Sequence, residues 1–241
     1  MMTTTATTVR LPSPPPPVPP ELAGIRLRRG SSPPDTRCYC AMQVVNLLAG
    51  QELDSASETA CPIASATIIV LNDGIWDDQR RNDLLLPLLP AVVGSRGDVR
   101  NTQKRIFQAA DWALRRFAPV ELEALGRHRQ AEFLRQLPAI IDVATARRSE
   151  RVAAAVAPAA ASDLACALAS VETTRGRGYI DGIDGPVRQL DRLLDLAAFL
   201  ALEPEFRKRA AESAESEPLP LDEEMAAALG VEFLEALLEV P

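Results

Sequence analysis

Three cysteines in the first part of the chain are the residues whose type best suits chemistry. Cys38 and Cys40 lie two positions apart in the stretch TRCYC, and Cys61 follows in TACPIA. Cysteine thiolates bind zinc, react as nucleophiles and form disulfides. We expect a helix amino terminus near each of these cysteines, and a helix amino terminus lowers the pKa of a thiol. The three residues therefore define one hypothesis, a zinc-binding or redox-active protein. The competing and favoured interpretation is that each cysteine packs as a small apolar side chain.

The spacing of the possible ligands argues against zinc. Structural zinc sites contain C-x-x-C pairs, or one such pair with two histidines, whereas this chain has C-x-C and one histidine, His128. Residues two apart in a helix point about 200° away from each other, so Cys38 and Cys40 converge only if Cys38 precedes the helix. His128 stands between Arg127 and Arg129, whose charges lower its basicity. We therefore expect no cofactor and assign no catalytic residue.

A glycine-rich stretch, RGRGYIDGIDGP, carries Arg175, Arg177 and Tyr179. It lacks the G-K-[ST] ending of a phosphate-binding loop. Its arginines could still bind an anion or a carboxylate of a partner, although a turn-rich connector is the favoured interpretation.

The chain has two tryptophans, and one of them, Trp76, lies in the loop-like stretch NDGIWDDQ. An exposed tryptophan in a loop is a candidate anchor for a protein partner. Packing beneath the loop is the favoured alternative, because the indole has a large apolar surface. The other, Trp112, is expected to be buried on a helix against Phe107 or Phe117.

The stretch DEEMAAALGVEFLEALLEV is expected to form an acidic amphipathic helix near the C-terminal end, with Gly230 as a weak point. Phe233 and Leu237 belong to its apolar stripe. Such a helix docks either on its own protein or in the groove of another. Phe233 and Leu237 are therefore candidate binding residues, with docking on the chain's own body as the default.

The elements that position these residues are expected to be helices. Apolar residues make up 47% of the chain but aromatic residues only 4%, and stretches with the period of a strand are scarce. The predicted fold class is all-α, an irregular multi-helix bundle. Residues 59–71 stay open between helix and strand, because TIIVL is rich in β-branched side chains while Pro62 suits the first turn of a helix.

Three regions are expected along the chain. Residues 1–35, rich in threonine and proline, are predicted to be a disordered tail. Residues 36–145 are predicted to form a helical domain. Its first helix would run from Cys38 to Ala49, its clearest helix is DVRNTQKRIFQAADWALRRF, and Pro119 would open a further short helix. Residues 146–241 are predicted to form a second helical lobe, and whether both regions share one core is left open.

Charge and apolar patterning limit the function classes. A net charge of -7 disfavours nucleic-acid binding, which depends on neutralising phosphates, although the arginines of GIRLRRG and RRFAPVELEALGRHR keep it as a third possibility. We see no apolar run long enough to span a membrane, and no secretory leader or disulfide pattern. We expect a cytoplasmic protein, and the preference for arginine over lysine points to a bacterial source.

Part of the chain resembles a family of uncharacterised bacterial helical proteins. The resemblance rests on CPIASATIIVLNDGIWDDQRRNDLLLPLLPAVVGSR, AADWALRRFAPVELEALG and LRQLPAIID, which match a C-P…N-D-G…L-P-L-L-P…A-D-W pattern. It covers residues 38 to about 143 and implies a helical domain. No activity is attached to the family, so the resemblance assigns no functional residue.

These observations favour a non-enzymatic interaction or accessory protein that presents helical surfaces to a protein partner. The alternative is a metal-binding or redox-active protein that uses Cys38, Cys40 and Cys61. The partner and the oligomeric state are not predicted.

Overall fold

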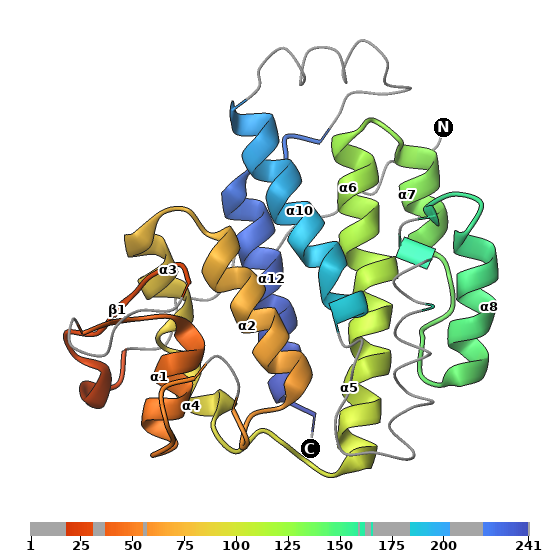
Figure 1. The fold of residues 1–241 in the computed structure, drawn as a ribbon. Helices are drawn as coiled ribbons and strands as arrows, with labels where there is room; N and C mark the ends of the chain where they lie inside the picture. The colour runs from red at the N-terminus through yellow and green to blue at the C-terminus, as the bar shows by residue number, and fades with distance from the viewer. Residues whose placement is uncertain are drawn as a thin grey trace.

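The computed structural model describes residues 18–30, 37–54, 57–158, 160–161, 165, 184–202 and 219–240. These residues are mostly helical, which confirms the all-α prediction (Figure 1). The chain begins with a 3-10 helix η1 (Pro20–Leu22) and two short strands, β1 (Arg26–Leu27) and β2 (Cys38–Tyr39). The helices that follow are α1 (Ala41–Leu48), α2 (Pro62–Gly74), α3 (Asp78–Leu85), α4 (Leu89–Val92), α5 (Val99–Trp112), the π-helical segment η2 (Ala113–Phe117), α6 (Ala118–Ala124), α7 (His128–Arg135), α8 (Val143–Ala153), α10 (Asp184–Leu202) and α12 (Glu223–Leu238).

Helices α2, α10 and α12 pack against one another at the centre of the molecule, with α5 and α6 beside them (Figure 1). Their close approach depends on a small residue in α12. A Cβ added to Gly230 would lie 2.5 Å from Cδ2 of Leu71, so a larger residue would force the Leu71 side chain or α2 to move. Helix α12 is continuous through Gly230, and the expected weak point is a packing site. Buried side chains from both expected helical regions belong to one hydrophobic cluster.

The C-terminal helix is part of this core. Phe233 and Leu237 are both 0% exposed, so the proposal that they contact a partner is corrected: their apolar surface is used within the chain itself. The ring of Phe233 lies 5.3 Å from that of Phe117. Trp112 packs against Phe117 as expected, but it is partly rather than fully buried. Residues five apart are about 140° apart around an α-helix, and the wider π turn of η2 brings these two rings to the same side. Arg105 stabilises the end of α12, because its Nε donates a 3.0 Å hydrogen bond to the carbonyl of Leu237.

Residues 62–74 form a helix, which decides the question left open for the TIIVL stretch. Pro62 occupies its first turn, where the missing N–H has no partner to lose. The β-branched side chains are accepted because the buried face of α2 packs on α10 and α12, and tertiary packing outweighs a small difference in helix propensity. In the described part of the chain, no helix combines the length and the apolar composition needed to cross a bilayer.

Helices α5 and α6 join through η2 into one rod, whereas Pro119 was expected to open a separate helix (Figure 1). The N–H of Ala118 donates to the carbonyl of Ala113, five residues earlier, which is a π-type bond. Pro119 has no N–H and its ring crowds the preceding turn of an α-helix. The wider π turn just before Pro119 takes up this crowding, so the rod continues.

Residues 18–30 pack on the helical body, so the expected disordered segment extended too far along the chain. Leu22 and Leu27 are each only 1% exposed. Strand β1 pairs with β2 in parallel, with Arg26 opposite Cys38 and Leu27 opposite Tyr39. Two buried leucines within this basic and proline-rich stretch supply the apolar anchors that its composition did not suggest. The rest of the expected tail, residues 1–17 and 31–35, lies outside the described part.

Candidate partner-binding site

The structure separates the roles of the three cysteines. Cys38 is partly exposed in β2, Cys40 is the N-cap of α1, and Cys61 is buried at the N-cap position of α2. All three are free thiols. Across the described ranges, no three side chains of the Cys, His, Asp or Glu type are grouped so that they could hold a metal ion. The described residues therefore provide no positive support for the cysteine hypothesis.

Cys40 has a local structural role. Its Sγ accepts a 3.4 Å hydrogen bond from the N–H of Gln43, whose side-chain Oε1 accepts the N–H of Cys40 at 3.0 Å. This reciprocal cap starts α1 at Ala41, later than the expected start at Cys38, because Cys38 and Tyr39 pair with β1. Burial raises the pKa of the Cys40 thiol, an effect that the hydrogen bond from Gln43 opposes. A neutral thiol is a poor nucleophile and a poor metal ligand.

A buried arginine organises the corner between α2 and α3. The Arg81 side chain is 0% exposed, and its Nε donates a 2.7 Å hydrogen bond to the carbonyl of Asn72. Its Nη2 donates to the carbonyl of Ile75, and its Nη1 contacts Asp78 at 2.5 Å and the carbonyl of Leu27 at 3.5 Å. Arg81 therefore joins the end of α2 to β1. The sequence did not predict this role, because nothing in it shows which of the two adjacent arginines, Arg80 or Arg81, is buried.

Two asparagines hold β1 over the same corner. Asn82 Oδ1 accepts the N–H of Leu27 at 2.8 Å, and Asn72 Nδ2 donates to the carbonyl of Arg28 at 3.0 Å. Asn72 also accepts the N–H of Ala41 through Oδ1 at 3.2 Å. The bonds to Leu27 and Arg28 satisfy main-chain groups that the pairing of β1 with β2 leaves open. They hold the extended main chain of β1 above α3.

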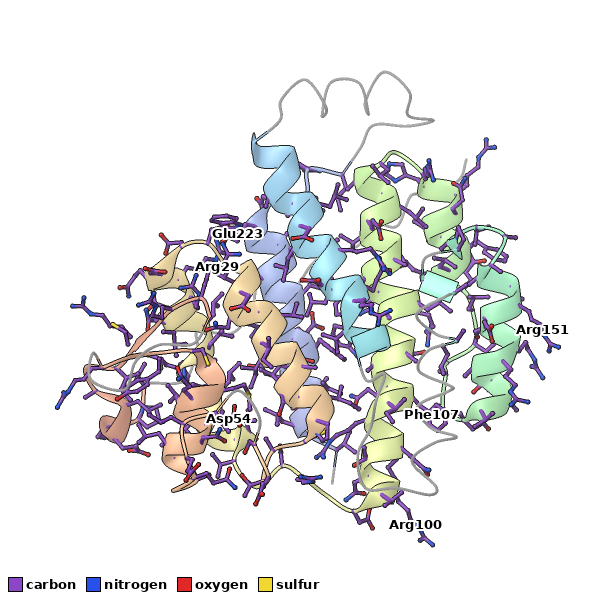
Figure 2. The ribbon with its side chains drawn as sticks, in the orientation of Figure 1. Arg29, Asp54, Arg100, Phe107, Arg151 and Glu223 are labelled. Carbon is purple, nitrogen blue, oxygen red and sulfur yellow. The ribbon has the colours of Figure 1, made fainter. Side chains whose placement is uncertain are left out.

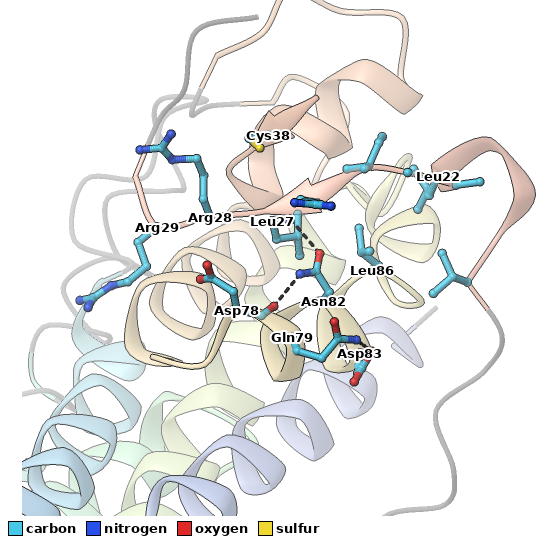
Figure 3. A pocket seen from close by; sticks show the side chains of 15 residues that line it. Leu22, Leu27, Arg28, Arg29, Cys38, Asp78, Gln79, Asn82, Asp83 and Leu86 are labelled. Carbon is cyan, nitrogen blue, oxygen red and sulfur yellow. Dashed lines mark hydrogen bonds between the residues drawn. The ribbon is translucent and has the colours of Figure 1, made fainter. Parts of the chain in front are cut away.

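A groove of about 900 Å³ lies between the η1–β1 segment and α3 (Figure 3). One wall carries Arg26, Arg28 and Arg29, which are exposed. Figure 3 shows Leu22 at one end of the groove and both Arg28 and Arg29 at the opposite end. The groove therefore has an apolar end and a basic end.

Trp76 lies beside the basic end. Its side chain is 59% exposed, so the favoured expectation that it packs beneath the loop is wrong. The guanidinium of Arg29 lies 4.1 Å from the centre of the indole ring, and the main-chain N–H of Trp76 donates a 3.1 Å hydrogen bond to Glu223 Oε1. Figure 2 shows Arg29 and Glu223 close together at this edge of the molecule. Because Arg29 also lines the groove, the indole and the groove form one continuous surface.

A second cavity of about 390 Å³ is less suited to a ligand. Its lining residues are Asp111, Trp112, Arg115, Arg116 and Arg135. Each of its three arginines already forms an ion pair with a carboxylate of the chain: Arg115 with Asp111, Arg116 with Glu232, and Arg135 with Glu123. A bound anion would have to compete with these carboxylates.

The loop candidates Arg175, Arg177 and Tyr179 lie outside the described residues. The groove was not predicted from the sequence, because residues 1–35 were assigned to a tail. The alternation of Ile25 and Leu27 with Arg26 and Arg28 in ELAGIRLRRG was the available signal that this stretch packs on the body.

Comparison with known proteins adds no relative: no family model, no curated protein and no solved structure matches the chain. The function is therefore argued from the geometry of the site.

Proposed function

We propose that the chain is a non-enzymatic accessory protein that binds a protein partner through Trp76 and the groove between β1 and α3. The observation that supports this proposal is that the indole of Trp76 is 59% exposed although two contacts hold its loop. Arg29 covers one part of the ring, and Glu223 accepts the main-chain N–H of Trp76. Tryptophan is among the residue types most enriched in the anchors of protein interfaces.

The energetics favour an aromatic anchor at this position. A partner that covers the exposed part of the indole would gain about 2–4 kcal/mol from burial of apolar surface. Because Arg29 and Glu223 already restrain the loop, little conformational entropy would be lost when the partner binds. The adjoining groove supplies further contact area for a segment of the same partner.

The proposal includes a cytoplasmic location. Cys38, Cys40 and Cys61 are free thiols, which suits a reducing compartment. The net charge of -7 makes a protein partner a better match than a nucleic acid.

The test is site-specific photo-crosslinking in cells that naturally express the chain. The photoreactive residue p-benzoylphenylalanine replaces Gln79, an exposed residue that lines the groove, so that Trp76 stays in place. In the control it replaces Phe133, an exposed residue on α7. We expect a discrete protein adduct at position 79 that unlabelled wild-type protein competes away and Trp76→Ala does not. Adducts of equal yield at both positions, or none at position 79, would contradict the proposal.

A further inference from the structure

We infer that the segment of the partner that enters the groove is acidic and carries at least one large apolar side chain. This inference rests on the proposed function and names the chemistry of the partner. It depends on the charges along β1, on the carboxylates that face them, and on the apolar end of the groove.

The arginines of the basic wall are available to bind a charged ligand. Arg26, Arg28 and Arg29 are exposed, and none of them forms an ion pair with another described residue. The guanidinium of Arg29 lies over the face of Trp76. Each guanidinium has five N–H donors in a planar arrangement that matches a carboxylate. Three such groups along one short stretch favour a ligand that brings several carboxylates.

The opposite wall cancels only part of this charge. Two carboxylates of α3 line the groove, Asp78 and Asp83. Asp78 is engaged at 2.5 Å by the buried guanidinium of Arg81, and Asp83 accepts a 2.8 Å hydrogen bond from Gln79. The charge of Asp78 is therefore balanced from inside the protein. The lining of the groove therefore has more arginines than carboxylates, and Arg28 and Arg29 lie together at one end (Figure 3). Asp73 borders this end, where its Oδ1 accepts the N–H of Gly30 at 3.2 Å.

The apolar residues that line the groove explain the apolar requirement. Val18 is 43% exposed, whereas Leu22 and Leu86 contribute only small exposed parts of their side chains, 1% and 5%. A leucine or phenylalanine of the partner could cover this surface and remove it from water. The ligand that fits both ends is a peptide segment with carboxylates at one side of an apolar residue.

A nucleic acid fits the same arginines less well. Near Trp76, Glu223 binds the main chain and Glu224 lies 3.7 Å from Arg80, so carboxylates border the basic end. A phosphate backbone carries a charge on every nucleotide and would pass these groups at a cost. A short peptide segment can place its carboxylates on Arg28 and Arg29 alone.

The experiment is a selection of short random peptides, displayed on phage, on the immobilised full-length protein. The selection is repeated on Trp76→Ala, on the double variant Arg28→Gln/Arg29→Gln, and on the control Arg100→Gln/Arg151→Gln. The control removes the same charge from two exposed arginines on α5 and α8, which Figure 2 shows far from Arg29. We expect wild type and control to enrich peptides that combine Asp or Glu with a large apolar residue. These peptides should bind the Arg28/Arg29 double variant at least about tenfold more weakly.

A charge-reversal variant shows whether a loss of peptide binding comes from the lost arginine charge or from misfolding of the variant. The double variant Arg28→Glu/Arg29→Glu is expected to enrich basic peptides in place of acidic ones, a gain that an unfolded protein cannot show. Peptides without an acidic bias, or peptides that bind the Gln double variant as tightly as wild type, would overturn the acidic assignment. If the binding of these non-acidic or arginine-independent peptides is still lost in Trp76→Ala, the proposed function is supported and only the acidic assignment is overturned. No enrichment on wild type, or arginine-dependent retention of short single-stranded DNA alone, would overturn both.

Discussion

The Nε of Arg81 donates a 2.7 Å hydrogen bond to the main-chain carbonyl of Asn72, and both residues are buried. The carbonyl belongs to the last turn of α2, so the guanidinium places a positive charge where the helix dipole is negative. The same side chain reaches the carbonyl of Leu27 in β1. One arginine therefore connects the central helix to the strand that carries the basic wall of the groove.

Replacing Arg81 by methionine should lower the free energy of unfolding by about 2–4 kcal/mol, because each buried carbonyl left without a donor costs roughly 1–3 kcal/mol. The matched control is Arg80→Met. Arg80 forms a 3.7 Å ion pair with Glu224 at the surface, which is worth at most about 1 kcal/mol. Urea unfolding of the three proteins measures the difference. Equal losses for the two variants would show that the buried hydrogen bonds of Arg81 contribute little.

Asn82→Ala should loosen β1 without unfolding the helices, because Asn82 holds the N–H of Leu27. Limited trypsin digestion reports this directly, since the enzyme cleaves after arginine and β1 is followed by Arg28 and Arg29. We expect faster cleavage at these bonds than in wild type. Gln79→Ala is the control on the same helix, as Gln79 bonds Asp83 and not β1. Unchanged cleavage in Asn82→Ala would mean that other contacts suffice to hold the strand.

Gly230→Ala should destabilise the protein by roughly 1–3 kcal/mol through overpacking, against a gain of about 1 kcal/mol in helix propensity. The new Cβ would lie 2.5 Å from Leu71 and 3.1 Å from Leu190. A double-mutant cycle with Leu71→Ala checks the cause. The two changes should be less damaging together than the sum of the single effects, since the truncated side chain makes room for the methyl group. Strict additivity would rule out the proposed contact.

Stability should fall in alkaline solution partly because of Cys40. Burial raises the pKa of this thiol in the folded protein, whereas in the unfolded chain it ionises near about pH 8.5. Above that pH the unfolded state binds fewer protons than the folded state, so the free energy of unfolding decreases by at most about 1.4 kcal/mol per pH unit from this group. Urea unfolding at several pH values should show a shallower decline for Cys40→Ala than for wild type. Identical slopes would contradict the raised pKa.

A metal chelator should leave the thermal midpoint of the reduced protein unchanged. In the described part of the chain, Cys38, Cys40 and Cys61 belong to no group of three or more ligand-type side chains that could hold a metal ion, and Cys40 already accepts a main-chain N–H. Native mass spectrometry before and after chelation provides the second readout. One zinc per chain, lost together with thermal stability, would favour the cysteine hypothesis over the proposed function.

The sequence by itself determined the features that depend on neighbouring residues. Pro62 suits a first helical turn because its missing N–H lies where no intrahelical bond forms, and the structure has it there. Ile106, Ala109 and Ala110 are buried along one side of α5, because residues three and four positions apart share a helix face. The low aromatic content and the helical periodicity were sufficient to predict an all-α fold.

Only the tertiary structure decided the features that depend on residues far apart in the chain. Arg81 is buried and Arg80 is not because the carbonyls of Asn72, Ile75 and Leu27 converge on one position. Phe233 and Leu237 are buried because α12 packs between other helices, and Trp76 is exposed because none of them covers its loop. An amphipathic pattern shows which face is apolar, but the packing of the whole chain determines what covers that face.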